Sequence, residues 1–284
     1  MFIWLLEYEH IVNNRHLRGE ISRKTLSDYH RLIKFCREHL AHIRLEDITV
    51  ADISHALADK TREVPHSARR LRINLSNLFI EAQRAGRLAP GYNPALITRP
   101  VTAQVKTSRL TLQEWLRIFR CAKYRAPGFF QIAMLLSLVT AQRPSDVRKM
   151  HADDISDGYL HITQQKTGEK IALPVTLHLD AISTSLSDIL DICPRTGYLI
   201  CDRHGQPVNT WSLSRWFRLC REQVQIDLGS GETPPTFREH RSLAERLYRA
   251  QNLDTRTLLG HRYQQMTDQY NNPRGKEYRK LLIP

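Results

Sequence analysis

The sequence lacks the residue patterns that bind structural or catalytic metals. Its five cysteines contain no Cys-x-x-Cys pair, the spacing typical of zinc sites. An odd number without regular spacing indicates reduced thiols in a cytosol. The adjacent acidic pairs Glu46-Asp47 and Asp153-Asp154 have no further carboxylate cluster beside them, so a metal-dependent nuclease fits poorly. The cysteines are Cys36, Cys121, Cys193, Cys201 and Cys220.

No segment has the composition of a membrane span or of a secretion signal. Phe2–Leu6 is apolar, but Glu7 and Glu9 follow at once. The segment is too short for a span and lacks the basic start of a signal peptide. Internal repeats and low-complexity tracts are missing as well, and we predict no membrane partner.

Positive charge is what the sequence has in excess. Its 284 residues include 42 lysines and arginines against 29 aspartates and glutamates, which gives a net charge of +13. The basic residues are spread along the chain, which favours an extended polyanion such as nucleic acid over a small acidic ligand. The length exceeds the usual size of one domain, so we expect two.

The first hundred residues have the pattern of a helical domain, which we place at residues 1–99. Thr49 followed by Asp52 is typical of a helix start. A longer helix is expected from Ser67 to Ala85, with Gly86 as its stop. Residues 100–108 follow a stretch rich in proline and glycine and are predicted to form a linker.

The second domain is predicted to span residues 109–284 and to be mostly helical. Thr111 with Glu114 forms a capping box, and Phe129–Val139 is apolar enough for a buried helix. Tyr159–Thr163 and Ile171–Val175 are rich in β-formers around a turn-like Thr-Gly step, which predicts an antiparallel hairpin. The expected fold is mainly α with a small antiparallel β-sheet. Further helices are expected at 183–192 and 210–224.

Four short segments carry the residue types that handle phosphate, and a tyrosine follows them. An arginine, a lysine, a second arginine, a histidine and a tyrosine stand in that order, at Arg143, Lys166, Arg241, His261 and Tyr270. Their contexts, TAQRPSD, QKTGEK, PTFREHRSL and LLGH, resemble the active site of the tyrosine recombinases. The likeness to the lambda-type phage integrases runs over nearly the whole chain. It implies a two-domain clamp around DNA, with a helical, SAM-like core-binding domain and a catalytic domain.

The resemblance implies a site-specific recombinase that cuts and rejoins DNA through a 3′-phosphotyrosyl intermediate. Tyr270 would attack the phosphorus, and the ester would keep the energy of the broken bond, so religation needs no ATP, metal or cofactor. Arg143 and Arg241 would hold the non-bridging oxygens, because a guanidinium stays protonated and matches two phosphate oxygens. Lys166, on its hairpin, resembles the family's mobile lysine and general acid, with Lys170 as a rival.

Two further residues complete the implied site. His261 follows Gly260, which would end a short helix and turn the imidazole toward the phosphate as a donor. Asp146 matches the family's acidic residue and would orient a basic neighbour. Both arginines are expected at helix starts, where free amides favour an anion. Pro144 suits a first helical position, and Thr236 with Glu239 predicts a capping box before the second arginine.

The chain departs from the family pattern at the second arginine. Arg238 stands where the family has the histidine of His-x-x-Arg. An arginine, with a pKa above about 12, accepts no proton but still donates hydrogen bonds to phosphate. We therefore expect the phosphate grip to survive and any base role at this position to be lost. His240 should point away from the site, and Ala141, where the family often has glycine, predicts a local backbone adjustment.

Outside the active site, the resemblance makes Arg69, Arg70, Arg72 and Lys106 candidates for DNA binding, although such clusters are often only solvated faces. The implied partners are double-stranded attachment sites, a homotetramer on that DNA, a bending protein and a directionality factor. The basic tail 271–284 would pack on a neighbouring subunit. Contacts to phosphates would make the affinity fall steeply with salt.

The resemblance places the protein at the nucleoid in the bacterial cytoplasm, encoded by a phage or prophage. Lambda-like integrases also carry an amino-terminal arm-binding domain, whereas this chain starts at the core-binding helices. A trimmed protein, a simpler recombinase and a prophage remnant all agree with that start. An alternative function is a catalytically impaired remnant that binds attachment-site DNA without efficient recombination. A topoisomerase with similar chemistry is a further alternative.

Overall fold

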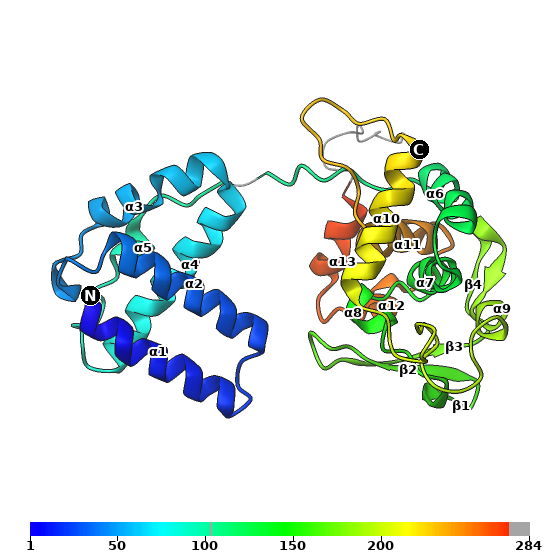
Figure 1. Cartoon of the computed structure of the whole chain (residues 1–284), viewed down its shortest axis with the longest axis horizontal. Helices are drawn as coiled ribbons and strands as arrows, with labels where there is room; N and C mark the ends of the chain where they lie inside the picture. Colours follow the sequence, from blue (N-terminus) through cyan, green and yellow to red (C-terminus); the bar gives the residue numbers. More distant parts are fainter. Residues whose placement is uncertain (103, 273–284) are drawn as a thin grey trace, which may run out of the picture. The chain divides into compact units, whose positions relative to one another are not determined.

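A computed structural model of the chain describes residues 1–102 and 104–272. The chain divides into two compact units, Met1–Gln104 and Val105–Pro284. The blue and cyan helices of Figure 1 form the first unit, and the green to red elements form the second. The boundary falls within the segment 100–108 for which the sequence predicts a linker.

The first unit is a small helical bundle whose apolar residues recur three and four apart. On α1 the buried residues are Trp4, Leu5, Tyr8 and Val12, and this stripe packs along α2, while α3 packs along α4. The capping box of Thr49 and Asp52 at the start of α3 is confirmed. The helices are α1 (Phe2–Leu17), α2 (Arg23–His39), η1 (Leu45–Asp47), α3 (Val50–Glu63), α4 (Pro65–Arg84) and α5 (Pro94–Ile97).

Arg72 ties α4 to the chain that follows α5. Its guanidinium donates to the carbonyl of Leu96 at 2.8 Å and to the carbonyl and hydroxyl of Thr98 at 2.7 and 2.9 Å. Thr98 is buried, so its carbonyl and hydroxyl have little access to water. These bonds give Arg72 a structural role, whereas Arg69 is exposed and makes no side-chain hydrogen bond or ion pair with the described residues.

The second unit is mostly helical with two small antiparallel sheets, and the predicted fold class is confirmed. The capping box of Thr111 and Glu114 is confirmed as well. Its elements are α6 (Leu112–Arg125), α7 (Gly128–Val139), α8 (Pro144–Val147), η2 (Ala152–Asp154), β1 (Ile155–Ser156), β2 (Tyr159–Thr163), β3 (Lys170–Pro174), β4 (His178–Leu179), η3 (Asp180–Ile182), β5 (Thr184–Ser185), α9 (Leu186–Asp191), α10 (Thr210–Val224), α11 (Glu239–Ala250), α12 (Thr255–Leu259) and α13 (Gln264–Asn271).

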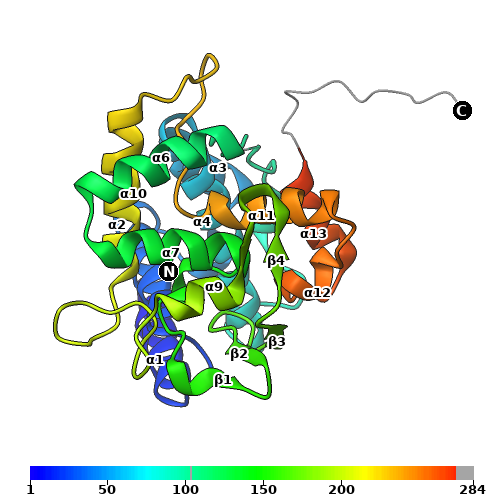
Figure 2. The same cartoon turned by 90° about the vertical axis from the view of Figure 1, so that its right-hand side faces the viewer.

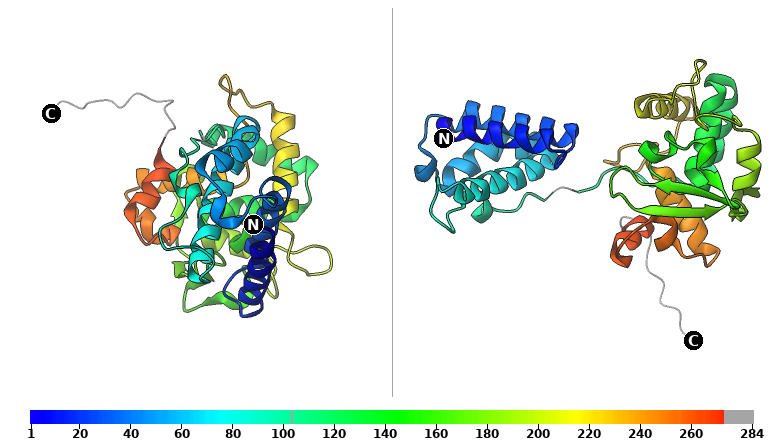
Figure 3. Two further views of the ribbon diagram at one scale, coloured as in Figure 1. Left: turned by 90° about the vertical axis from the view of Figure 1, so that its left-hand side faces the viewer. Right: turned by 90° about the horizontal axis from the view of Figure 1, so that it is seen from below.

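The strands β2 and β3 form the predicted hairpin. Leu160 pairs with Leu173 and Ile162 with Ile171, and all four are buried. The residues between them along each strand face water, which is the alternation expected of a sheet with one covered face. The right-hand view of Figure 3 shows the hairpin as the paired green arrows of the second unit. Its connection, residues 164–169, carries Lys166.

The helix α7 lies at the centre of the core of the second unit. Seven of its residues are buried, as expected of its nearly continuous apolar sequence. The helix α11 packs against α7 and α13, and α10 packs against α6 (Figure 2). One predicted helix, 183–192, starts late, because Thr184 and Ser185 pair with β4 and Ser185 then caps α9.

Two properties of the described residues bear on function. No helix in the described part of the chain is long and apolar enough to cross a membrane. Within residues 1–102 and 104–272, no three His, Cys, Asp or Glu side chains gather in a way that could hold a metal ion.

The contacts of Arg72 predict that Arg72→Ala destabilises the first unit. The change leaves buried acceptors of Thr98 without a partner, which costs about 1–3 kcal/mol. Arg69→Ala is the matched control on the same helix and should change the free energy of unfolding by less than about 0.5 kcal/mol. Urea denaturation followed by circular dichroism measures both. Equal stability of the two variants would contradict the structural role of Arg72.

Candidate active site

Arg143 stands at the start of α8, as predicted. It is the N-cap residue, and Pro144 occupies the first helical position. The turn from α7 into α8 passes through Ala141, which is fully buried with a φ of 55°. This left-handed conformation favours glycine, so the expected local backbone adjustment is a strained alanine. The turn leaves the carbonyl of Ala141 facing another arginine.

That arginine is Arg241, on the first turns of α11, and it is 2% exposed. Its Nη1 donates to the Ala141 carbonyl at 2.8 Å, and its Nη2 donates to the Leu259 carbonyl. Burial lowers the pKa of Arg241 to about 10, and the positive charge of Arg143 lowers it further. A hydrogen bond to the Tyr270 side chain acts in the opposite direction and raises the pKa. Its buried Nε has no acceptor among the described residues.

His261 follows α12, which ends at Gly260 in the left-handed region, as predicted. The Nε2 atom lies 3.1 Å from Nη2 of Arg241, and Nδ1 lies 3.0 Å from the Thr267 hydroxyl. A guanidinium only donates, so Nε2 must be the acceptor and Nδ1 carries the proton. Burial, together with the charges of Arg241 and Arg143, lowers the pKa of His261 to about 4. The imidazole is therefore neutral at physiological pH.

Tyr270 lies beside these two residues, half-buried on α13. Its ring centroid is 5.3 Å from that of His261, and the guanidinium carbon of Arg241 lies 5.7 Å from the ring centroid. The hydroxyl of Ser242 donates to the Tyr270 carbonyl at 2.9 Å. The structure thus gathers an arginine, a histidine and a tyrosine that stand far apart in the sequence.

Arg109 fixes the end of the helix that carries Tyr270. It donates to the carbonyls of Gln269 at 2.6 Å and Asn272 at 3.1 Å, and it forms an ion pair with Glu239 at 3.2 Å. The predicted capping box of Thr236 and Glu239 is wrong. The N-cap of α11 is Arg238, without a side-chain cap bond, and the Glu239 carboxylate is engaged by Arg109 instead.

Asp146 is buried beside Arg143. One carboxylate oxygen accepts a hydrogen bond from the backbone N–H of Gln165 at 2.9 Å. The other oxygen lies 3.9 Å from Arg143 and has no hydrogen bond among the described residues. The carboxylate therefore joins the start of α8 to the root of the hairpin, a placement that suits a supporting residue.

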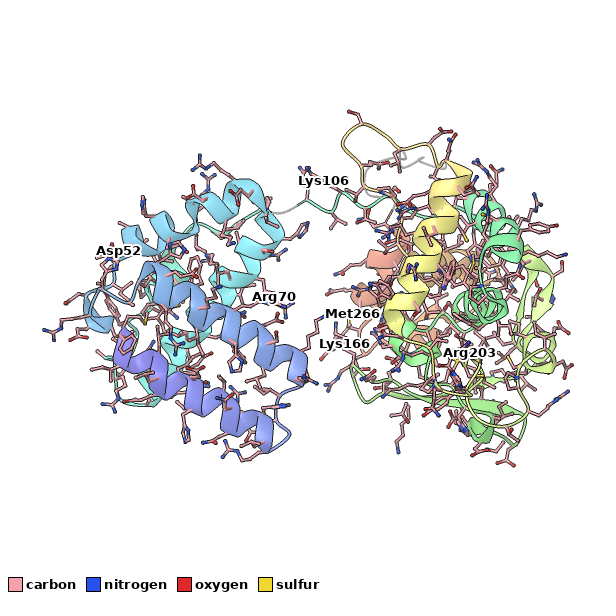
Figure 4. All side chains as sticks on the ribbon, viewed as in Figure 1. Asp52, Arg70, Lys106, Lys166, Arg203 and Met266 are labelled. Carbon is pink, nitrogen blue, oxygen red and sulfur yellow. The ribbon has the colours of Figure 1, made fainter. Side chains whose placement is uncertain are left out.

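Lys166 and Arg238 stand apart from this buried group. Lys166 is exposed on the connection between β2 and β3, where Figure 4 labels it. Arg238 is exposed at the start of α11. Neither side chain has a hydrogen bond or ion pair with the described residues, so both are open to a ligand. His240 points away as expected, into an aromatic cluster with Phe237, Phe217 and Trp115.

The basic residues proposed for DNA binding differ in their surroundings. Arg69 and Lys106 are exposed, whereas Arg70 forms an ion pair with Asp28 at 2.5 Å. Arg72 is held by the contacts described above. The tail from residue 273 onward, with its predicted docking role, lies outside the described residues.

Several residues that hold the cluster are ones that the sequence analysis did not single out. They gave no signal there, because a glutamine at the end of a strand or an arginine before a helix is ordinary on a protein surface. Their partners become visible only in three dimensions. They are Arg109, Gln142, Gln164, Ser242 and Thr267.

Comparison with known proteins places the chain in a family. Residues 108–277 match the model of the phage integrase family. The integrase of enterobacteria phage P21 is 39% identical over 97% of this chain and 75% of its own length. The prophage integrase IntE of Escherichia coli K12 is 38% identical over 99% of this chain and 77% of its own. The chain belongs to the phage integrase family of tyrosine recombinases.

Solved structures agree with this assignment. A lambda integrase dimer bound to a COC′ core site matches with a TM-score of 0.90 and 37% identity, over 100% of this chain and 99% of that chain. A lambda integrase tetramer bound to a Holliday junction matches with a TM-score of 0.89 and 37% identity, over 99% of this chain and 80% of that chain. The Tn1549 transposon integrase, at 13% identity and a TM-score of 0.70, shares the fold.

Gly260→Ala should disturb the loop that presents His261. A Cβ at this position would meet Ile171 at 2.6 Å and Gln164 at 2.8 Å, and the backbone has a φ of 59°. Left-handed strain alone costs about 1–2 kcal/mol, and the clash adds to it. Gly205→Ala is the matched control, because its φ is 73° and its Cβ would meet nothing within 4 Å. Urea unfolding should show a larger loss at Gly260, and equal losses would refute the close packing.

The buried histidines predict that acid destabilises the second unit. Burial lowers the pKa of His240 to about 4, and His261 has a similar value. Between pH 6.5 and 4 the unfolded chain binds protons that the folded chain excludes, so stability falls as the pH falls. For His240 the loss between pH 7 and pH 5 is about 2 kcal/mol. We expect His240→Phe to reduce the difference between the free energies of unfolding measured with urea at pH 7 and at pH 5. An unchanged difference would contradict a role of His240 in the acid sensitivity.

Proposed function

We propose that this chain is a site-specific DNA recombinase that cuts one strand through Tyr270 and rejoins it to another. The observation that carries the proposal is the packing of the Tyr270 ring against Arg241 and His261, at 5.7 and 5.3 Å. A nucleophile beside a buried cation and an imidazole suits attack on a phosphodiester.

Arg241 and Arg143 would bind the non-bridging oxygens of the scissile phosphate. Arg241 is held by backbone carbonyls rather than by a carboxylate, so its charge is not neutralised, and its Nε has no acceptor among the described residues. The one carboxylate paired with Arg143 in the described part of the chain, that of Asp146, lies 3.9 Å away. Two guanidinium groups whose positive charge is not balanced by a close carboxylate favour a negatively charged ligand.

His261 would change its role when the phosphate binds. Without it, Nε2 accepts a hydrogen bond from Arg241. A phosphate beside the imidazole opposes the effect of the two arginines and raises the pKa of His261 from its low value. The protonated imidazole can then donate from both nitrogens, one to Thr267 and one to a phosphate oxygen.

The cleavage step is balanced without a metal or ATP. A bond forms between the Tyr270 hydroxyl oxygen and phosphorus, and the bond from phosphorus to the 5′ oxygen breaks. The tyrosine proton passes to water, because Arg238 accepts none. The 5′ oxygen takes its proton from Lys166, whose exposed place on the hairpin suits a group that enters only with DNA. Attack by a new 5′ hydroxyl reverses these steps.

The first unit would act as a core-binding domain and the second as the catalytic domain. Arg69 and Lys106 are exposed and suit contacts to the DNA backbone, and Arg70 would exchange its exposed pairing with Asp28 for phosphate. By likeness to lambda integrase, which is seen as a dimer on a core site and as a tetramer on a Holliday junction, we propose a homotetramer on attachment-site DNA. Such a protein acts at the nucleoid in the cytoplasm of its bacterial host.

Covalent trapping on a nicked attachment site tests the proposal. DNA that loses a short fragment after cleavage cannot religate, so an active enzyme accumulates as a protein–DNA adduct. Candidate sites are the junctions that flank the encoding element. We expect the adduct with the wild type and its complete loss with Tyr270→Phe, which removes only the nucleophilic oxygen. The ring contacts are kept in this variant, so binding of the same DNA should remain.

A second function, DNA binding without efficient cleavage, is favoured by the arginine at position 238. It predicts specific binding of the same DNA by the wild type without any adduct. That result would replace the recombinase by an impaired prophage remnant.

A further inference from the structure

Gln164, the residue after β2, is fully buried, and its side chain uses its whole hydrogen-bonding capacity. Its Oε1 accepts from Nη1 of Arg143 at 2.6 Å and from the Thr167 hydroxyl at 2.9 Å. Its Nε2 donates to Oε1 of Gln142 at 2.8 Å and to the Leu259 carbonyl at 3.0 Å. A carboxamide has two acceptor positions and two donor hydrogens, and all four are occupied here.

These four bonds join three segments that each carry a residue of the proposed site. Gln142 and Arg143 lie on the turn before α8. Thr167 belongs to the connection that carries Lys166. Leu259 lies two residues before His261, and its carbonyl also accepts from Arg241. One amide is therefore bonded directly to Arg143 and, through a shared acceptor, linked to Arg241.

The side-chain amide of Gln164 packs closely against the backbone at Gly260. Gly260 approaches so closely that a Cβ there would lie 2.8 Å from Nε2 of Gln164. The backbone of Gln164 also closes the base of the hairpin connection, since its N–H donates to the Glu169 carbonyl and its own carbonyl accepts from Gly168, both at 2.8 Å. The side chain has no alternative direction that would keep these bonds.

We propose that Gln164 is a positioning residue of the active site, which holds Arg143 in register with the loop of Leu259 and His261. This inference rests on the proposed function and deepens it. A guanidinium acts on a transition state only when its donors point at the oxygens that gain charge. Among the described residues, Arg143 has one close orienting partner, Gln164, because its carboxylate neighbour Asp146 is 3.9 Å away. The neutral amide of Gln164 also orients the guanidinium and leaves its positive charge in place. A carboxylate at the same position would neutralise that charge.

The test compares Gln164→Met with Gln131→Met in the full chain. Methionine nearly keeps the volume of glutamine and removes every polar bond. Gln131 is the matched control, since it is partly buried and donates from Nε2 to the Phe119 carbonyl in the same unit, away from the proposed site. The rate of adduct formation is measured in single turnovers at saturating nicked DNA. We expect a fall of about ten- to a hundredfold for Gln164→Met and less than about twofold for the control.

Gln164→Asn is the second variant, in case the methionine variant does not fold. Asparagine keeps an amide but withdraws it by one methylene from Arg143, and its rate should fall in the same direction. DNA with sulfur in place of the 5′ bridging oxygen adds a readout that a purely structural residue would not move. A sulfur leaving group needs no general acid, so this substrate rescues defects of Lys166. It should not rescue Gln164→Met, whose defect lies in the phosphate grip.

The outcomes separate this inference from the proposed function. Failure of the wild type to form an adduct refutes the recombinase itself. The contribution of Arg143 to phosphate binding is then measured as DNA affinity alone, with DNA that carries a neutral methylphosphonate at the scissile position. This DNA should bind the wild type more weakly than ordinary DNA, and the difference should shrink in Gln164→Met. A Gln164→Met rate within twofold of the wild type, full rescue by the sulfur substrate, or an undiminished methylphosphonate effect would each overturn the positioning role.

Discussion

The site depends on a buried guanidinium that is held by carbonyl groups and, within residues 1–102 and 104–272, by no carboxylate. Arg241 is 2% exposed, yet its hydrogen bonds go to the carbonyls of Ala141 and Leu259, to a neutral imidazole and to the Tyr270 side chain. Desolvation of an uncompensated charge is costly, and the lowered pKa of Arg241 reports this cost. In our proposal, a bound phosphate would supply the missing negative charge. Ligand binding would then offset an electrostatic cost that folding alone leaves in place.

The strained backbone around the site follows from the same need for carbonyl acceptors. A carbonyl can face Arg241 only where the chain turns out of a regular helix, because helical carbonyls are already bonded. One such turn passes through Ala141 at a φ of 55° and the other through Gly260 at 59°. Both conformations are disfavoured for residues with a side chain, and both stand next to a residue that handles phosphate in our proposal. Gln164 then completes the second turn by sharing the Leu259 carbonyl.

The sequence predicts those parts of the site that are local or that belong to a motif. The helix start at Pro144 and the helix end at Gly260 depend on residues next to each other, and both are confirmed. The grouping of Arg241, His261 and Tyr270 follows from the family resemblance. The capping box at Glu239 failed because Arg109 competes for that carboxylate from 130 residues away. Gln164 gave no signal, since a polar residue at a strand end is ordinary until its partners are known.

In the proposed mechanism, Arg238 would change the proton transfers of the site more than the strength of phosphate binding. Its side chain is exposed at the start of α11. A permanent cation there would add to the attraction of a phosphate, but it could not take the proton of Tyr270. In our proposal the bound phosphate raises the pKa of His261, so the imidazole carries a proton on each nitrogen and has no position left for the tyrosine proton. Water is then the remaining acceptor for that proton, and the half-buried position of Tyr270 would give water access to its hydroxyl.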